Sequence, residues 1–230
     1  MKNFKLIAFA LVMVLFTVTN LFSQGSFSYH FGASVPSGKF ADDDEDDFFL
    51  DENGRSGGAG LGLNFGVQYV YPLSTNGLGL FVGADITYNP LGKSIRDDIE
   101  DGYDADTDIT FPKYLNIPLS GGLHYTLKVN DKVSLFGKGG LAVNFLKVTN
   151  WKEEDSGLDD LVEKYDLATK LGYTLGGGLV LNDKIELGIT YMGIGKHEFD
   201  GEREEGSNDE KINDLEVEVG YTTFTIGFRF

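Results

Sequence analysis

The strongest constraint on the fold is a two-residue alternation of side-chain character that recurs eight times. In each run, one set of alternate residues is large and apolar, and the other set is small, polar or glycine. Leu63 and Phe65, for example, alternate with Asn64 and Gly66. This period is typical of β-strands, whose successive side chains point to opposite faces. The eight predicted strands cover residues 26–34, 60–71, 78–88, 115–125, 133–145, 171–181, 185–191 and 223–230.

The character of the two faces indicates which face meets the exterior. In a water-soluble sandwich or barrel, the bulky face points inward and the outer face is rich in charge. Here the second face is too small and too rich in glycine to be a solvated exterior. It suits the crowded interior of a narrow barrel with bulky residues facing lipid. The sequence therefore predicts an all-β fold, an eight-stranded antiparallel up-and-down transmembrane β-barrel.

The connections between the predicted strands alternate between short and long. This asymmetry is typical of transmembrane barrels, which have short periplasmic turns and long extracellular loops. The long connections hold 30 of the 36 acidic residues, so lipid-facing strand positions carry almost no charge. We therefore predict short periplasmic turns and long acidic extracellular loops. The short connections span residues 72–77, 128–132 and 182–184, and the long ones span residues 35–58, 90–113, 147–170 and 195–214.

The N-terminal segment has the composition of an export signal. Two lysines precede an uncharged apolar run over residues 6–18, and the small residue Ser23 follows. This order is typical of a cleaved signal peptide, and the run is too short to span a bilayer as a helix. We predict a signal peptide over residues 1–23 and one barrel domain over residues 24–230, in the cell outer membrane. The absence of cysteine excludes lipoprotein acylation and disulfide bonds.

Two segments carry a family resemblance. Residues 114–119 read Tyr-Leu-Asn-Ile-Pro-Leu, and the chain ends with Ile226, Phe228 and Phe230 at alternate positions. The first segment is similar to the Tyr-Leu-Glu-Ile-Pro-Leu segment of PorT-like outer-membrane barrels, with Asn116 in place of the glutamate. The second resembles the C-terminal signal that the barrel-assembly machinery recognises. The chain thus resembles the PorT-like family and, more broadly, small OmpA- and OmpX-type barrels of the porin family, which implies no catalytic residues.

Several charged and polar residues fall on the inward face of the predicted strands. Ion pairs inside so narrow a barrel are normally structural. We expect Glu186 to pair with Arg229 on the next strand, and Asp85 to pair with Lys138 across the lumen. The alternative hypothesis is that these charges line a narrow conductive path or gate. The charged residues and histidines of the inward set are Asp85, Lys138, Glu186, Arg229, His30 and His124, and its amide residues are Asn64, Gln68, Asn116 and Asn144.

The loops contain candidate sites of their own. Asp104, Asp106 and Asp108 are candidate calcium ligands, although the glycine and the final glutamate of an EF-hand are missing, and a solvated acidic loop is the simpler interpretation. The apolar spacing between Leu158 and Tyr165 predicts a short helix. That helix and residues 48–50 are expected to pack over the barrel mouth, with contact to a partner as the alternative. Proline cannot donate to a strand ladder, so Pro118 predicts a β-bulge.

These patterns predict a noncatalytic outer-membrane barrel that presents acidic surface loops, for adhesion, cation interaction or envelope integrity. The alternative is a small porin or gated channel, and the third hypothesis is a lipid-modifying enzyme. An enzyme would need His30, His124 or His197, and no serine lies at a motif spacing from them. We expect no cofactor. The expected partners are outer-membrane lipid, the barrel-assembly machinery and divalent cations or surface ligands, whereas the net charge of −17 argues against nucleic acid.

Overall fold

The computed structural model describes residues 25–43, 48–49, 54–103, 107–155, 160–206 and 208–230, and most of these residues lie in β-strands. The predicted signal peptide and its cleavage site lie outside the described residues. Among the described residues, no helix combines the length and the apolar composition needed to cross a membrane.

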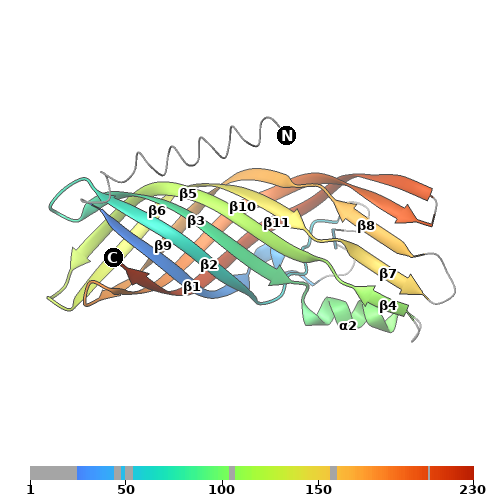
Figure 1. Cartoon of the computed structure of the whole chain (residues 1–230), viewed down its shortest axis with the longest axis horizontal. Helices are drawn as coiled ribbons and strands as arrows, with labels where there is room; N and C mark the ends of the chain where they lie inside the picture. The colour runs from blue at the N-terminus through green and yellow to red at the C-terminus, as the bar shows by residue number, and fades with distance from the viewer. Residues whose placement is uncertain (1–24, 44–47, 50–53, 104–106, 156–159, 207) are drawn as a thin grey trace.

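Antiparallel strands wind into a closed ring (Figure 1). Each strand pairs with the next one around the ring, and β11 pairs with both β10 and β1, which closes it. Backbone N–H and C=O groups of the ring strands therefore find partners on both sides. The ring consists of β1 (Ser26–Pro36), β2 (Gly62–Pro72), β3 (Leu78–Pro90), β5 (Lys113–Lys128), β6 (Val133–Val148), β9 (Ala168–Leu181), β10 (Ile185–Glu205) and β11 (Asn208–Arg229).

The last residues of the chain close the seam between β11 and β1. The backbone N–H of Phe230 donates to the carbonyl oxygen of Phe27 at 2.8 Å, and Phe27 N–H donates back to Phe230 at 3.2 Å. On the outer surface, the rings of Phe228 and Phe230 lie 5.4 Å and 5.7 Å from the ring of Tyr29. The C-terminal aromatic residues thus contribute to the closing strand pair itself.

The polarity of both barrel faces inverts along the strands, and β11 shows this most clearly. Near the C-terminus, the outward face of β11 carries the exposed apolar residues Phe224 and Ile226. Further from the C-terminus, the same face carries the charged residues Glu218 and Glu216. The two-residue period therefore continues while the character of each face changes. The inward residues change in the opposite sense, from polar Thr225 and Thr223 to buried Tyr221, Val219 and Val217.

The long connections are largely structured. β10 and β11 continue to pair over residues 195–205 and 208–214, where the sequence predicted a loop. The register shifts between Gly193 and Gly195 and again between Phe199 and Gly201, and buried residues still alternate with exposed ones from His197 to Gly201. Further strands extend the sheet in the order β10-β8-β7-β4. A 3-10 helix, η2 (Gly38–Phe40), follows β1. The remaining elements are α2 (Lys93–Asp101), β4 (Thr107–Thr110), β7 (Trp151–Asp155) and β8 (Leu161–Tyr165).

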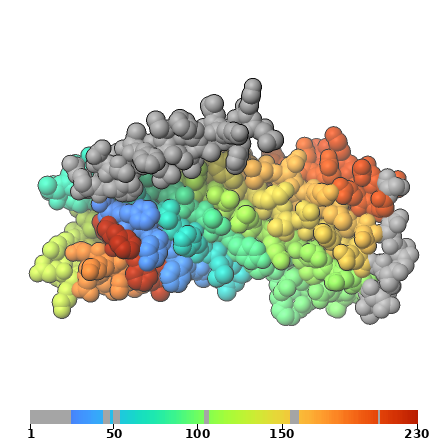
Figure 2. Space-filling view, in the orientation of Figure 1, coloured from blue at the N-terminus to red at the C-terminus, as the bar shows by residue number. Residues whose placement is uncertain are grey.

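These added elements form one end of the molecule. In the space-filling view, α2 and β4 in green gather beside β7 and β8 in yellow and orange, away from the C-terminal residue (Figure 2). The short turns lie at the opposite end (Figure 1). We refer to the two ends as the loop end and the turn end.

Two local predictions from the sequence are wrong. The predicted helix between Leu158 and Tyr165 is replaced over its described part by β8, which pairs with β10. Pairing across the sheet stabilises this segment more than its weak helical periodicity does, because a short isolated helix is only marginally stable.

The predicted bulge at Pro118 is absent. Ala84 lies opposite Leu119 and Thr87 lies opposite Asn116, so the register of β3 and β5 is the same on both sides of the proline. The ladder between β5 and β6 runs through Pro118 without a shift. The missing N–H is thus accommodated by a local gap in the β3–β5 pairing, without an extra residue in either strand.

The close approach of β5 and β6 gives a stability prediction. A Cβ at Gly140 would lie 2.1 Å from the carbonyl oxygen of Gly121, whereas a Cβ at Gly137 of the same strand would meet nothing within 4 Å. We expect Gly140→Ala to lower the free energy of unfolding by about 1–3 kcal/mol. Gly137→Ala is the matched control, with a change within about 0.5 kcal/mol. Urea unfolding in detergent micelles measures both, and equal losses would contradict the close approach.

Candidate functional site

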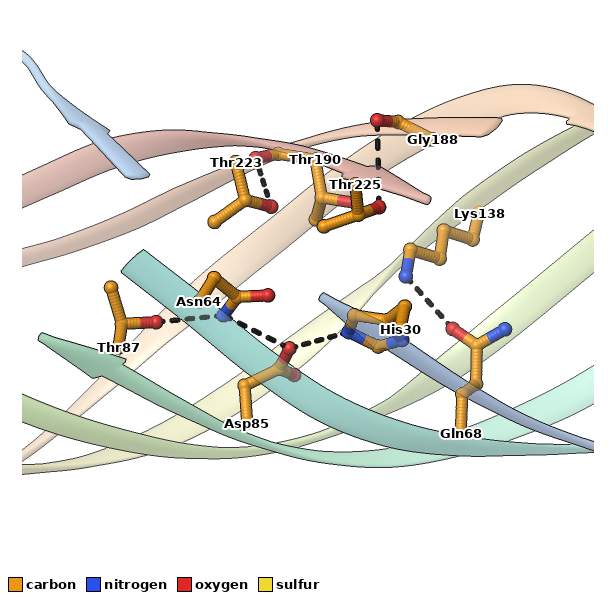
Figure 3. Close-up of polar contacts among 10 residues, drawn as sticks. All are labelled: His30, Asn64, Gln68, Asp85, Thr87, Lys138, Gly188, Thr190, Thr223 and Thr225. Atoms are coloured by element: carbon orange, nitrogen blue, oxygen red, sulfur yellow. Dashed lines mark hydrogen bonds and ion pairs between the residues drawn. The ribbon is translucent and has the colours of Figure 1, made fainter. Parts of the chain in front are cut away.

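A polar network fills the ring interior toward the turn end (Figure 3). Nε2 of His30 on β1 lies 2.7 Å from Oδ1 of Asp85 on β3. The two side chains meet across Gly66 of the intervening strand β2, where a Cβ would lie 2.3 Å from Asp85 Oδ1 and 2.5 Å from His30 Nε2. Asn64 donates to the same Asp85 oxygen at 3.3 Å and to Thr87 Oγ1 at 2.9 Å. The glycine is therefore required for this contact.

Lys138 approaches the network from β6. Its Nζ donates to Oε1 of Gln68 on β2 at 2.8 Å (Figure 3). The same Nζ lies 5.6 Å from the ring centre of Phe81. The predicted ion pair between Asp85 and Lys138 is not formed, because Asp85 accepts its contacts from His30 and Asn64 on its own side of the barrel. The two charges do line the same small cavity.

The predicted pair between Glu186 and Arg229 is also not formed. The register places Glu186 opposite Gly227, two residues short of Arg229. Glu186 lines the interior cavity with Lys138, whereas Arg229 lines a separate recess at the turn end together with His124. The His124 ring stacks on a neighbouring phenylalanine ring, Phe136, with centroids 5.4 Å apart.

Side chains fill the interior at the level of this network. The cavity among His30, Asp85, Lys138 and Glu186 encloses about 10 Å³, which is room for one water molecule at most. Tyr221 lines this cavity and belongs also to the apolar core on its loop-end side. The described side chains therefore close the interior at this level.

A second closure lies toward the loop end. There Phe49, from the connection between β1 and β2, is 1% exposed, and its ring centre lies 6.2 Å from Tyr114, 5.8 Å from Tyr165 and 6.2 Å from Phe199. Phe40 lies 5.1 Å from Tyr114, whose hydroxyl donates to the carbonyl oxygen of Gly57. We call these five aromatic residues the aromatic plug.

The plug confirms part of a prediction made from the sequence. The expectation that residues 48–50 pack over the barrel mouth holds for Phe48 and Phe49, which are both buried. Leu50 lies outside the described residues. The inward residues of the loop-end half are mostly apolar, and apolar side chains from the connection between β1 and β2 complete their packing.

A larger cavity, which we call the mouth pocket, opens at the loop end. It has a volume of about 430 Å³. Its walls come from α2, β7, β8 and β10, and Phe48 contributes to its apolar lining. The residues that line it are Phe48, Ile95, Asp98, Ile99, Gly102, Tyr103, Trp151, Glu153, Glu163 and Arg203.

Two glutamates of the mouth pocket are held in different ways. Glu163 is 3% exposed and accepts from Nε and Nη2 of Arg203 at 2.8 Å and 2.5 Å. The Oε1 atom of Glu153 accepts instead from Trp151 Nε1 and from the Tyr103 hydroxyl, each at 2.7 Å. Burial, together with the hydrogen bond to Glu153, raises the pKa of Tyr103 to about 12, so this hydroxyl remains a donor at neutral pH. Glu163 thus has a cationic partner, and Glu153 has neutral donors.

The candidate calcium ligands are only partly described. Asp104 and Asp106 lie outside the described residues, and Asp108 is an exposed residue of β4. Within the described part of the chain, no three histidine, cysteine or acidic residues are grouped closely enough to hold a metal ion. The calcium site therefore stays a prediction.

Comparison with known proteins identifies the family. A family model for the outer membrane protein beta-barrel domain matches residues 8–222. The chain belongs to this family. Its location is accordingly the outer membrane, as the sequence predicted. No curated protein matches the chain.

Several solved structures are similar to the chain. A major outer membrane protein from Thermus thermophilus is 17% identical, with a TM-score of 0.50 over 90% of this chain and 99% of that chain. OprG from Pseudomonas aeruginosa is 15% identical, with a TM-score of 0.48 over 90% and 96%. Ail from Yersinia pestis is 15% identical, with a TM-score of 0.41 over 90% and 99%. At this identity, the likeness to the Thermus protein supports the fold alone.

The mouth pocket was not predicted from the sequence. Its residues come from segments far apart in the chain, and none belongs to a recognisable motif. One signal was available, because Trp151 and Glu153, like Glu163 and Tyr165, stand two residues apart inside the predicted third loop. This spacing is typical of strands, with alternate side chains on one face.

The polar network around Asp85 gives a second stability prediction. Asp85→Ala removes the acceptor shared by His30 and Asn64, and we expect it to lower the free energy of unfolding by about 1–3 kcal/mol. Asp131→Ala is the control, because the Asp131 side chain lies in a short turn and is 98% exposed. Urea unfolding of both variants in micelles measures the difference. A loss for Asp85→Ala no larger than for the control would show that the network does not stabilise the barrel.

Proposed function

We propose that the protein is a noncatalytic, eight-stranded transmembrane barrel whose filled interior makes it a rigid support for a binding surface at the loop end. The observation that carries this proposal is the double closure of the interior. The polar network leaves a cavity of about 10 Å³, and the aromatic plug seals the loop-end half. A barrel filled at two levels is suited to holding its outer elements in place and poorly suited to passing solutes.

The polarity inversion supports a placement in the membrane. Outward apolar residues such as Leu63 and Leu141 are 69% and 62% exposed, and so broad an apolar surface would be unfavourable in water. In this placement the hydrocarbon surrounds the turn-end half, and its boundary crosses β11 near Thr222. The short turns then face the periplasm, the acidic loop end faces outward, and residues 1–23 are removed on export.

Contacts of the three histidines support a noncatalytic role. His30 pairs with Asp85 inside the ring, and His124 stacks on Phe136. His197 is buried, and its Nε2 lies 3.2 Å from Asn144 Nδ2. Each ring is thus buried within the barrel. Cation interaction is the noncatalytic role that best fits the loop end, where most of the acidic residues lie.

Electrical recording tests the closed interior. We expect the mature protein in a planar lipid bilayer to show no discrete conductance steps, and we expect Asp85→Ala and Lys138→Ala to remain silent because the aromatic plug still closes the barrel. A general porin reconstituted in the same way is the positive control. Reproducible single-channel steps from the unaltered protein would overturn the proposal in favour of a gated channel.

Charge substitution tests the membrane placement. Ile226→Lys introduces an ammonium group on the face that we assign to hydrocarbon, and we expect it to lower the free energy of unfolding in lipid vesicles by about 2–4 kcal/mol. Thr222→Lys on the same face of β11 is the control at the boundary, with an expected loss of about 0–1 kcal/mol. Equal losses at both positions would contradict the assigned boundary.

A further inference from the structure

Glu153 combines a fixed position with an uncompensated charge. Its Oε1 atom accepts from Trp151 and Tyr103, which are both uncharged, and no lysine or arginine in the described part of the chain pairs with it. Its Oε2 atom has no hydrogen-bond partner among the described residues. The carboxylate is thus oriented by the protein while one of its oxygens remains available.

The walls around Glu153 are mainly apolar and aromatic. Phe48, Ile99 and Trp151 line the mouth pocket beside it, and the pocket volume of about 430 Å³ falls in the range of small-molecule sites. Arg203 is the one cationic side chain of the lining, and it is already bonded to Glu163. With Asp98 also in the lining, the pocket carries a net negative charge.

We propose that the mouth pocket binds an alkylammonium ion, either a primary ammonium group on a short apolar stem or a quaternary ammonium group with small alkyl substituents. The ammonium group lies against Glu153, and the stem packs on Trp151 and Phe48. Aromatic faces attract such cations through their quadrupole, and a carboxylate adds a direct charge interaction. This inference rests on the proposed function, since it names the ligand class for the surface that the barrel supports.

Other ligand classes fit the pocket less well. A divalent metal ion needs several oxygen ligands, and no group of three metal-binding side chains occurs within the described residues. An anion would need Arg203, which Glu163 already holds in two hydrogen bonds. A neutral apolar molecule would leave the carboxylate of Glu153 without a counter-charge in a partly dehydrated site.

The chain contains its own reporter for this pocket. Trp151 is the sole tryptophan in the sequence, so the intrinsic tryptophan fluorescence reports on the pocket lining alone. We would titrate the mature protein in detergent micelles with n-butylammonium and with tetramethylammonium at constant ionic strength. n-Butanol serves as the neutral probe of similar shape. A saturable fluorescence change is expected with the ammonium ions and not with n-butanol.

A matched pair of variants tests the role of the charge. Glu153→Gln keeps a carbonyl oxygen for Trp151 and Tyr103 and removes the charge, and we expect it to weaken ammonium binding about tenfold or more. Glu154→Gln makes the same change of charge at the next residue, which is exposed and outside the pocket lining, and should alter binding less than about twofold. If Glu153→Gln does not refold, Ile99→Lys is the substitute, because its own ammonium would occupy the pocket and abolish binding.

Three results would overturn the inference. They are the absence of saturation with either ammonium ion, equal weakening by Glu153→Gln and Glu154→Gln, and an n-butanol titration that matches that of n-butylammonium. Conductance recorded on the same preparation separates this inference from the proposed function. A silent barrel that binds no amine overturns the ligand assignment alone, whereas a conducting barrel overturns the support role.

Discussion

Closure of the backbone hydrogen-bond ladder is the constraint on which the rest of this structure depends. In the transmembrane placement that we propose, an unpaired N–H or C=O in hydrocarbon would cost several kcal/mol, so the sheet must have no free edge. β11 meets this requirement by pairing with β1 and β10, and the terminal Phe230 takes part in the last pair. A ring this narrow has an interior that side chains must fill. Contacts such as that of His30 with Asp85 over Gly66 follow from that need.

The polarity inversion explains how the same strands can have an apolar outer surface in the turn-end half and an apolar core in the loop-end half. From Glu216 to Phe228 of β11 the alternation keeps its phase, yet Ile226 and Glu218 share one face while Thr225 and Val217 share the other. In the turn-end half the apolar residues face outward, and in the loop-end half they form an ordinary buried core. The loop-end half therefore gains stability from hydrophobic burial in its own right, and this fixes the elements that carry the mouth pocket.

The strands of the ring could be predicted from the sequence because the two-residue period is local and the apolar row is long. The extension of β10 and β11 at the loop end could not be predicted. On the N-terminal side of Thr222 in β11, the outward residues include charged side chains, so the pattern no longer resembles that of a lipid-facing strand. The pairing partners of the charged residues inside the barrel could not be predicted from the sequence either. Asp85 and Lys138 lie at similar heights, but the missing side chain of Gly66 gives Asp85 a nearer partner. The mouth pocket depends on the register of four separate segments, which no local pattern contains.

The closure of the barrel and the mouth pocket share a structural element. Phe48 and Phe49 are consecutive, with ring centres 4.8 Å apart, yet Phe49 lies in the aromatic plug while Phe48 lines the mouth pocket. Similarly, Tyr165 contributes its ring to the plug and donates its hydroxyl to Glu163 at 2.7 Å. Any rearrangement that withdrew the plug would therefore displace a wall of the pocket and a partner of its buried glutamate. A closed interior and an intact pocket are thus properties of one conformation, and a ligand that binds the pocket stabilises the closed barrel.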